Sequence, residues 1–147
     1  MPDEETILSE VEAFYRSYIK AWNRRDPGEI AYCYDRPHVG LSGEHALSLV
    51  STDAEQERWC LQALAIYAEC GWEQIGIDGL QVWPFSTSLA QLTSDISRYG
   101  KDGSVLQRGR YSYMLRRRQD GWKVMAFATV DEPFSGPGLA RRVAQDR

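Results

Sequence analysis

The chain has 147 residues, the size of one ordinary domain, and 43% of them are hydrophobic and 12% aromatic. These values exclude a disordered chain and predict a single buried core. The net charge of −4 comes from interspersed acidic and basic residues, so we expect no nucleic-acid partner.

The cysteine content and the N-terminal residues bear on the compartment. Cys33, Cys60 and Cys70 are an odd number without Cys-x-x-Cys spacing, and the start MPDEETILSE lacks the pattern of a signal peptide. No apolar run approaches the roughly 20 residues that cross a bilayer. The residues also show no metal-ligand spacing, phosphate loop or nucleophile elbow. We therefore expect a cytoplasmic protein with no membrane partner, no metal and no cofactor.

Two helices are predicted before residue 35. From Ile7 to Trp22 the apolar residues recur in steps of three and four, which indicates a long amphipathic helix ending near Arg25. The run Asp26-Pro27-Gly28-Glu29 supplies an N-cap, a proline at the first helical position and an acid in the first turn. It predicts a short second helix over about residues 27–34.

A third helix follows an extended segment. Pro37 disfavours helical backbone at the residue before it, so HVGLSG is expected to continue as a short strand or loop. Thr52-Asp53-Ala54-Glu55 is a capping box that announces the third helix, and Gly71 closes it.

Beyond Gly71 the hydrophobic period changes to two, which predicts an antiparallel meander. Its four strands are expected at about residues 73–85, 88–99, 105–117 and 122–130. A phase shift at Asp78-Gly79 predicts a bulge and a strongly curved sheet. The fold class is therefore α+β, with three N-terminal helices packed on a strongly curved, mainly antiparallel sheet. Residues 1–131 form the single domain, and residues 132–147 are expected to be a partly mobile tail.

Side-chain alternation predicts which residues of the strands face the helices. The inward set is Ala90, Leu92, Ser94, Ile96, Arg98, Tyr111, Tyr113, Leu115, Trp122, Val124, Ala126 and Ala128. Small residues among them, opposite the aromatic side chains of the first helix, would leave a hollow inside the sheet.

The same alternation places large apolar residues on the outer face of the sheet. Trp83, Phe85, Met125 and Phe127 would project there, and such a patch usually marks an interface. We therefore expect a homodimer through the outer sheet face, with Trp83 and Phe127 buried in it. In the alternative, the C-terminal tail folds back through Phe134 and Leu139 and leaves a monomer.

The succession of AWNRRD, PGEIAYCYD, PHVGLSG, a third helix and a meander ending in DGWKV resembles the nuclear transport factor 2-like (NTF2-like) superfamily. The resemblance covers about residues 7–130 and is greatest to the SnoaL-like branch of polyketide cyclases and ketosteroid isomerase-like proteins. It implies a cystatin-like cone with a pocket, in which the corner at Asp26-Pro27 lets two helices close one wall. It also supports dimerisation, since many members pair sheet to sheet. The superfamily includes isomerases, cyclases, hydrolases, dehydratases, carriers and dimerisation modules, so the fold alone assigns no activity.

The catalytic motifs of the superfamily are missing at the corresponding positions. Ketosteroid isomerase-like members place a carboxylate base on the segment after the second helix, where this chain has no acid between His38 and Ser42. Asp35 precedes Pro37 and is expected to be a surface cap or turn residue. Limonene epoxide hydrolase-like members carry three charged residues on one strand face as Asp-x-Arg-x-Asp. Here Asp95 lies three residues from Arg98 and therefore on the opposite face, where we expect solvent or an interface.

Two titratable residues remain as candidates for the pocket. His38 could act as an acid or base near neutral pH, although a partly exposed loop histidine is the favoured interpretation. Arg98 is expected at the mouth of the cone, or paired with a ligand anion or a carboxylate, because a buried unpaired charge is costly.

The expected ligand-binding set is Tyr15, Tyr18, Trp22, Tyr34, His38, Arg98 and Tyr113. The leading hypothesis is that these residues bind a small, largely apolar ligand in an aromatic-lined conical pocket. A second hypothesis is an isomerase, cyclase or hydrolase that uses a pocket His or Tyr as acid or base. A third is a non-catalytic interaction module whose aromatic side chains fill the cone. A cavity of roughly 300 Å³ or more would favour the first two.

Overall fold

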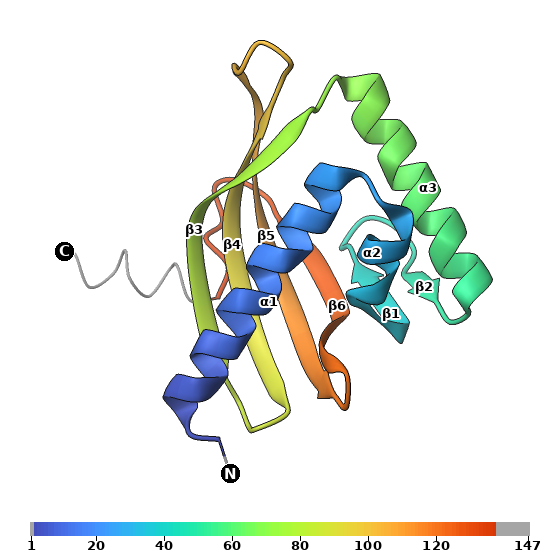
Figure 1. Ribbon diagram of the computed structural model, residues 1–147. Coiled ribbons are helices and arrows are strands. Elements are labelled where there is room, and N and C mark those ends of the chain that lie inside the picture. The colour runs from blue at the N-terminus through green and yellow to red at the C-terminus, as the bar shows by residue number, and fades with distance from the viewer. Residues whose placement is uncertain (1, 138–147) are drawn as a thin grey trace, which may run out of the picture.

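A long N-terminal helix lies across one face of a curved sheet in the computed structural model, which describes residues 2–137 (Figure 1). This helix, α1, spans Glu4–Arg24, and Asp3 caps it by accepting a hydrogen bond from the backbone N–H of Thr6. It ends at Arg25, whose φ of 55° is left-handed. Helix α1 therefore covers the range that the apolar stripe predicted.

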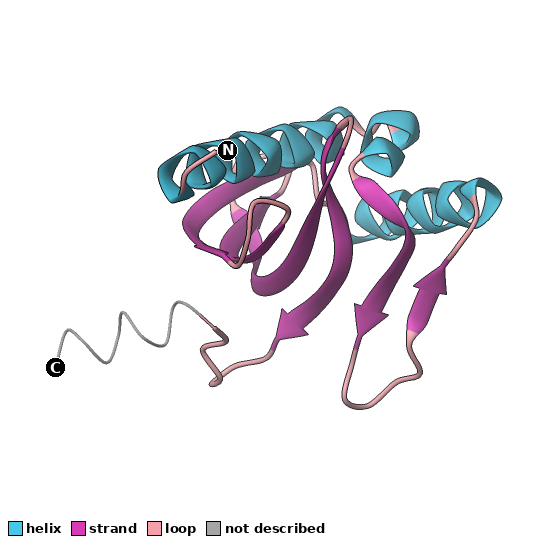
Figure 2. Cartoon of the chain, turned by 90° about the horizontal axis from the view of Figure 1, so that it is seen from below, coloured by secondary structure: helices cyan, strands magenta, loops and turns pink. Residues whose placement is uncertain are grey.

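The corner after α1 is built as its residues predicted. Helix α2 spans Pro27–Tyr32, and the Asp26 carboxylate accepts hydrogen bonds from the backbone N–H groups of Gly28 and Glu29. Figure 2 shows the helices gathered on one side of the strands. The corner thus keeps α2 on the same side of the sheet as α1.

Helix α3 spans Asp53–Cys70 and begins and ends at the predicted signals. Thr52 Oγ1 accepts from the N–H of Glu55, and Gly71 takes a left-handed φ of 75° after the last turn. Within the described part of the chain, no helix is long and apolar enough to cross a membrane.

The sheet has six strands in the order β2-β1-β6-β5-β4-β3. The strands are β1 (Tyr34–Leu41), β2 (Ser48–Val50), β3 (Gln74–Pro84), β4 (Leu89–Tyr99), β5 (Val105–Arg118) and β6 (Gly121–Val130). All neighbours pair antiparallel except β1 and β6, which are parallel. The predicted meander is confirmed, and the segment expected as a short strand or loop is β1. Tyr34 begins this strand instead of ending the second helix, because Val124 N–H binds the carbonyl of Cys33 and starts the pairing with β6.

Two register shifts curve the sheet. The predicted bulge lies between Ile77 and Gly79 in the β3–β4 ladder. A second, unpredicted shift lies in the β5–β6 ladder, where Leu115 faces Val124 but Met114 faces Ala126, so Met125 is the extra residue. The side chains of β6 after Met125 therefore point to the face of the sheet opposite to the one that the alternation of the sequence predicted.

The second bulge corrects the predicted faces of β6. Phe127 lies directly across from the inward Tyr113, so it faces the helices and not the outer surface. Ala126 and Ala128, which pair with Met114 and Ser112, lie on the outer face. The outer-face patch therefore lacks Phe127, and the cone loses two of its expected small residues.

The chain that follows β6 lies against the outer face of the sheet. Thr93 Oγ1 donates a hydrogen bond to the carbonyl of Pro137, and Arg110 Nη1 donates one to the carbonyl of Ser135. The rest of the expected mobile tail, including Leu139, lies outside the described residues.

Candidate functional site

The interior of the cone is an aromatic cluster supplied by α1, β1 and β5. Tyr15, Tyr18 and Trp22 lie at positions i, i+3 and i+7 of α1, which places them on one face of the helix. Tyr34 from β1 and Tyr113 from β5 meet them, and all five side chains are buried. The ring centroids of Tyr18 lie 5.8 Å from Tyr34 and 5.9 Å from Tyr113. The predicted convergence of these residues is therefore present.

The hydroxyl groups of this cluster bond to one another and to the sheet. Tyr15 donates to Ser94 Oγ at 2.8 Å, and the hydroxyls of Tyr18 and Tyr34 are 2.6 Å apart. Burial raises the pKa of Tyr15 to about 12 and raises the pKa of Tyr18 and Tyr34 well above 10. These phenols therefore keep their protons at neutral pH, and they are proton donors rather than bases.

Three further aromatic residues complete the wall. Trp59 and Tyr67 come from α3, and Phe127 comes from β6 beyond its bulge. The Tyr67 ring stacks on Trp22 with centroids 5.1 Å apart, and Trp59 lies 5.9 Å from Phe127. Trp59 and Tyr67 are spaced with Ala63 in steps of four along the third helix, which is a helical apolar stripe, so the sequence contains a signal for them. Phe127 had no such signal, because nothing in β6 announced the bulge.

A cavity of about 170 Å³ remains between these side chains. It is lined by Tyr18, Ile19, Trp22, Tyr34, Trp59, Ala63, Tyr67, Ile75, Ile96, Arg98, Tyr111, Tyr113 and Phe127. Five of the seven predicted ligand-binding residues belong to this lining: Tyr18, Trp22, Tyr34, Arg98 and Tyr113. Tyr15 and His38 lie outside it, Tyr15 because its hydroxyl is held against Ser94.

Arg98 lies in the wall of this cavity and is not exposed at a mouth. The side chain is only 6% exposed, since Trp72 covers its guanidinium at 4.5 Å from the ring centroid. The guanidinium donates to the hydroxyls of Tyr67 and Tyr111 and to Gln107 Oε1. The expectation of a mouth arginine was therefore wrong, because α3 and the residues after it cover this end of the sheet.

His38 is a buried strand residue, which corrects the interpretation as a partly exposed loop histidine. It is 1% exposed on β1, and its Nε2 lies 2.7 Å from Gln56 Oε1 on α3. Gln56 donates from Nε2 to Cys60 Sγ, so its oxygen accepts and His38 donates. Nδ1 is then the acceptor of a neutral imidazole, and it has no partner within residues 2–137. Burial lowers the pKa of His38, which favours this neutral form.

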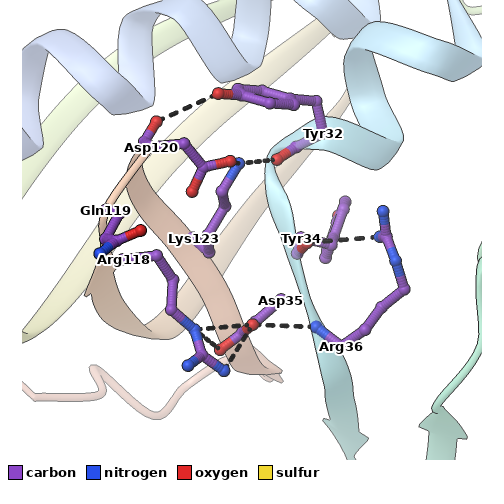
Figure 3. Close-up of a pocket in the computed structure, with 8 residues that line it drawn as sticks. All are labelled: Tyr32, Tyr34, Asp35, Arg36, Arg118, Gln119, Asp120 and Lys123. Carbon is purple, nitrogen blue, oxygen red and sulfur yellow. Dashed lines mark hydrogen bonds and ion pairs between the residues drawn. The ribbon is translucent and has the colours of Figure 1, made fainter.

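A second pocket, of about 510 Å³, lies at the surface where β1 meets the turn between β5 and β6 (Figure 3). Its lining consists of Tyr32, Tyr34, Asp35, Arg36, Arg118, Gln119, Asp120 and Lys123. Arg118 binds Asp35 at 3.0 Å, and Lys123 Nζ lies 3.2 Å from Asp120 and donates to the carbonyl of Tyr32. Asp35 is only 7% exposed, so its assignment as a surface cap or turn residue was wrong. Each of its three cations has a carboxylate partner, Arg36 pairing with Asp53 outside the lining, and the Arg118–Asp35 pair ties β1 to the neighbouring hairpin.

Asp95 is on the face opposite to Arg98, as expected, but an arginine covers it. Its carboxylate accepts from Arg110 at 2.6 and 3.1 Å, and both side chains are 30% exposed. They line a surface groove of about 930 Å³ between the sheet and residues 129–134. This ion pair is the cross-strand neighbour pair of β4 and β5, and it satisfies both charges.

The family assignment rests on a match over most of the chain. The model of the family described as NTF2-like protein (DUF6841) matches residues 9–132. The chain belongs to this NTF2-like family. No curated protein matches this DUF6841 member significantly.

Solved structures share the fold of this DUF6841 member. A domain of unknown function with a cystatin-like fold from Nostoc punctiforme has 17% identity over 98% of this chain and 86% of that chain, with a TM-score of 0.66. An NTF2-like protein of unknown function from Shewanella oneidensis has 11% identity over 84% and 98%, with a TM-score of 0.66. A ketosteroid isomerase-like protein from Erwinia carotovora has 22% identity over 87% and 96%, with a TM-score of 0.56. The cystatin-like, NTF2-like fold is confirmed, and the SnoaL-like branch stays a prediction.

Proposed function

We propose that this domain binds a small, largely apolar molecule inside the cone. The observation that supports the proposal is the cavity of about 170 Å³ among buried aromatic side chains. Protein cores are close-packed and seldom contain voids larger than a water molecule. Apolar cavities of about 150 Å³ are known to stay dry and to bind benzene.

The volume limits the ligand to about one ring. The cavity is smaller than the roughly 300 Å³ at which pockets for drug-sized ligands begin, so by the volume criterion stated above the interaction module with a largely filled cone keeps support as the alternative. The cavity therefore excludes a polycyclic ligand such as a steroid unless the walls move. The aromatic lining favours a flat ring, because offset and edge-on contacts between rings add to the gain from burial.

The catalytic alternative has less support. The residues that line the cavity include Arg98 and five tyrosines but no Asp, Glu or His, in the part of the chain that the structure describes. A proton abstraction would need a base, and burial raises the pKa of Tyr18, Tyr34 and Tyr113. His38 is next to Tyr34 but outside the lining. A binding role is therefore the better match to the geometry.

Toluene is a suitable neutral probe for this proposal. We expect it to bind the wild-type protein by calorimetry and to raise the thermal unfolding midpoint, since a ligand that binds only the folded state stabilises it. Ala63 lies in the cavity wall on α3, and Ala63→Leu should fill part of the volume and weaken toluene binding at least tenfold.

The matched control is Ala65→Leu, which makes the same change on the same helix at an exposed position. It should leave the affinity for toluene unchanged. Equal affinities for the two variants would show that toluene binds elsewhere and would contradict the proposal.

A further inference from the structure

Arg98 differs from the other buried or half-buried arginines in having no acidic partner. Arg36 pairs with Asp53, Arg110 with Asp95 and Arg116 with Asp35. Arg98 is 6% exposed, and within residues 2–137 no carboxylate forms an ion pair with it. Its four hydrogen bonds all go to neutral oxygens, on Tyr67, Gln107 and Tyr111.

A buried cation without a counter-charge is costly, even when its N–H groups are hydrogen-bonded. The rings around Arg98 offset part of this cost, because its guanidinium carbon lies 4.5 Å from the Trp72 ring centroid and 5.2 Å from that of Tyr67. The positive charge nevertheless remains uncompensated next to a cavity. An anion bound in that cavity would be attracted to the Arg98 guanidinium, and binding would not have to pay the cost of removing water from that cation, because folding has already done so.

The two tyrosines beside Arg98 have hydroxyl groups that are able to donate to such an anion. Tyr67 accepts two N–H bonds from the guanidinium, and Tyr111 accepts one at 2.9 Å. Each phenol therefore uses its oxygen lone pairs on Arg98 and keeps its own O–H hydrogen for another acceptor. Burial raises the pKa of Tyr67, so that hydrogen is present at neutral pH. Both residues line the cavity together with Arg98.

We propose that the ligand of this cavity is a small one-ring carboxylic acid, bound as its carboxylate. The carboxylate would accept from the hydroxyls of Tyr67 and Tyr111 next to the Arg98 charge, and the ring would lie against the aromatic lining. The inference rests on the proposed function and adds the chemical class of the ligand.

The charge and size of the site select a carboxylate over a phosphate. One guanidinium balances the single charge of a carboxylate, whereas a phosphate monoester brings ~1.5 to 2 negative charges at neutral pH. The Arg98 wall belongs to a cavity of about 170 Å³, which leaves little room beyond one ring and a planar anionic group.

Benzoate, benzamide and toluene test the inference on the wild-type protein. Benzoate and benzamide share a ring and a planar substituent but differ in charge. We expect benzoate to bind about tenfold to a hundredfold more tightly than benzamide by calorimetry at pH 7.5, because hydrogen bonds to charged groups are stronger than those between neutral groups. Phenylphosphonate should bind less tightly than benzoate.

The outcomes separate the two proposals. If toluene and benzamide bind but benzoate binds no more tightly than benzamide, the carboxylate inference is wrong and the proposed function stands. If none of the three binds, both are wrong. Tighter binding of phenylphosphonate than of benzoate would overturn the choice of a carboxylate.

Arg98→Gln tests the residue itself, with Arg108→Gln as the control. Both variants remove one positive charge, but Arg108 is exposed and does not line the cavity. Arg98→Gln should reduce the preference for benzoate over benzamide to about threefold or less, and Arg108→Gln should keep it. A preference that survives in a folded Arg98→Gln protein would overturn the inference. If Arg98→Gln does not fold, the three ligands on the wild-type protein still decide.

Discussion

At the scale of single residues, His38 shows how a side chain from a distant helix changes the character of a titratable group. Its ring lies between Tyr34 and Trp59, at centroid distances of 4.6 and 5.6 Å, and Gln56 holds its Nε2. Nothing in the segment PHVGLSG indicates this, because Gln56 and Trp59 lie on α3. Whether a strand residue such as His38 is buried depends on which distant elements pack over the strand, and local sequence does not specify those elements.

This environment predicts a pH dependence of stability. Burial lowers the pKa of His38 in the folded protein, so the unfolded chain, with an ordinary pKa of about 6.5, binds the proton more readily. The free energy of unfolding is therefore greatest above pH 6.5 and decreases as the pH falls below it. The slope from this one residue is at most about 1.4 kcal/mol per pH unit.

Urea unfolding of matched histidine variants measures this slope. The chain has only two histidines, and His45 is exposed in a loop. His38→Gln should lose less stability than the wild type between pH 7.5 and 5.5, and His45→Gln should behave like the wild type. Parallel curves for all three proteins would show that His38 is not the group responsible.

At the scale of secondary-structure elements, the sequence predicts where strands begin and end better than which way their side chains face. The bounds of β3 to β6 lie within one residue of the predicted ones, because turns rich in Ser, Asp and Gly interrupt the alternation. The bulge at Asp78 was also predicted, since Gly79 follows it. In β6 the run Val124-Met125-Ala126-Phe127-Ala128 is apolar at every position, so both facings satisfy the pattern. The sequence therefore contains no signal for the bulge at Met125 or for the inward position of Phe127.

The inward position of Phe127 has a measurable consequence. The ring contacts Tyr34, His38 and Trp59, so Phe127→Ala should cost about 3 kcal/mol of unfolding free energy, as truncations of packed phenylalanines do. Ile66→Ala is the control, because Ile66 is 52% exposed on α3, away from the expected dimer interface, and its truncation should change stability by less than about 0.5 kcal/mol. Chemical denaturation compares the two, and equal small losses would mean that Phe127 faces outward after all.

At the scale of the whole molecule, the assembly state stays a prediction. Trp83 faces outward across from Gln91 and Phe85 is exposed, but Phe127 is removed from the expected interface. Residues 135 and 137 also bind Arg110 and Thr93 on that face. A sheet-to-sheet homodimer would therefore have to bury Trp83 and Phe85 together with the chain that follows β6.

Sedimentation velocity of the full chain at micromolar concentration tests the dimer. We expect a dimer for the wild type, and a folded monomer for Phe85→Lys, since a lysine in the centre of an apolar interface is unfavourable. A wild-type monomer at that concentration would mean instead that the chain beyond β6 covers the face by itself.

The parallel pairing of β1 with β6 also bears on the order in which the protein folds. Tyr34 and Val124 are ladder partners although 90 residues separate them in the chain, whereas the strands of the meander are joined by short turns. Contacts between such distant segments form slowly, because the entropic cost of closing the loop between them comes before the contact contributes any stabilisation. During synthesis β1 is therefore complete well before its partner β6 emerges. We therefore expect the wall that carries Tyr34 and Phe127 to assemble last, and a chain that stops before β6 to have the aromatic helix face but no closed cone.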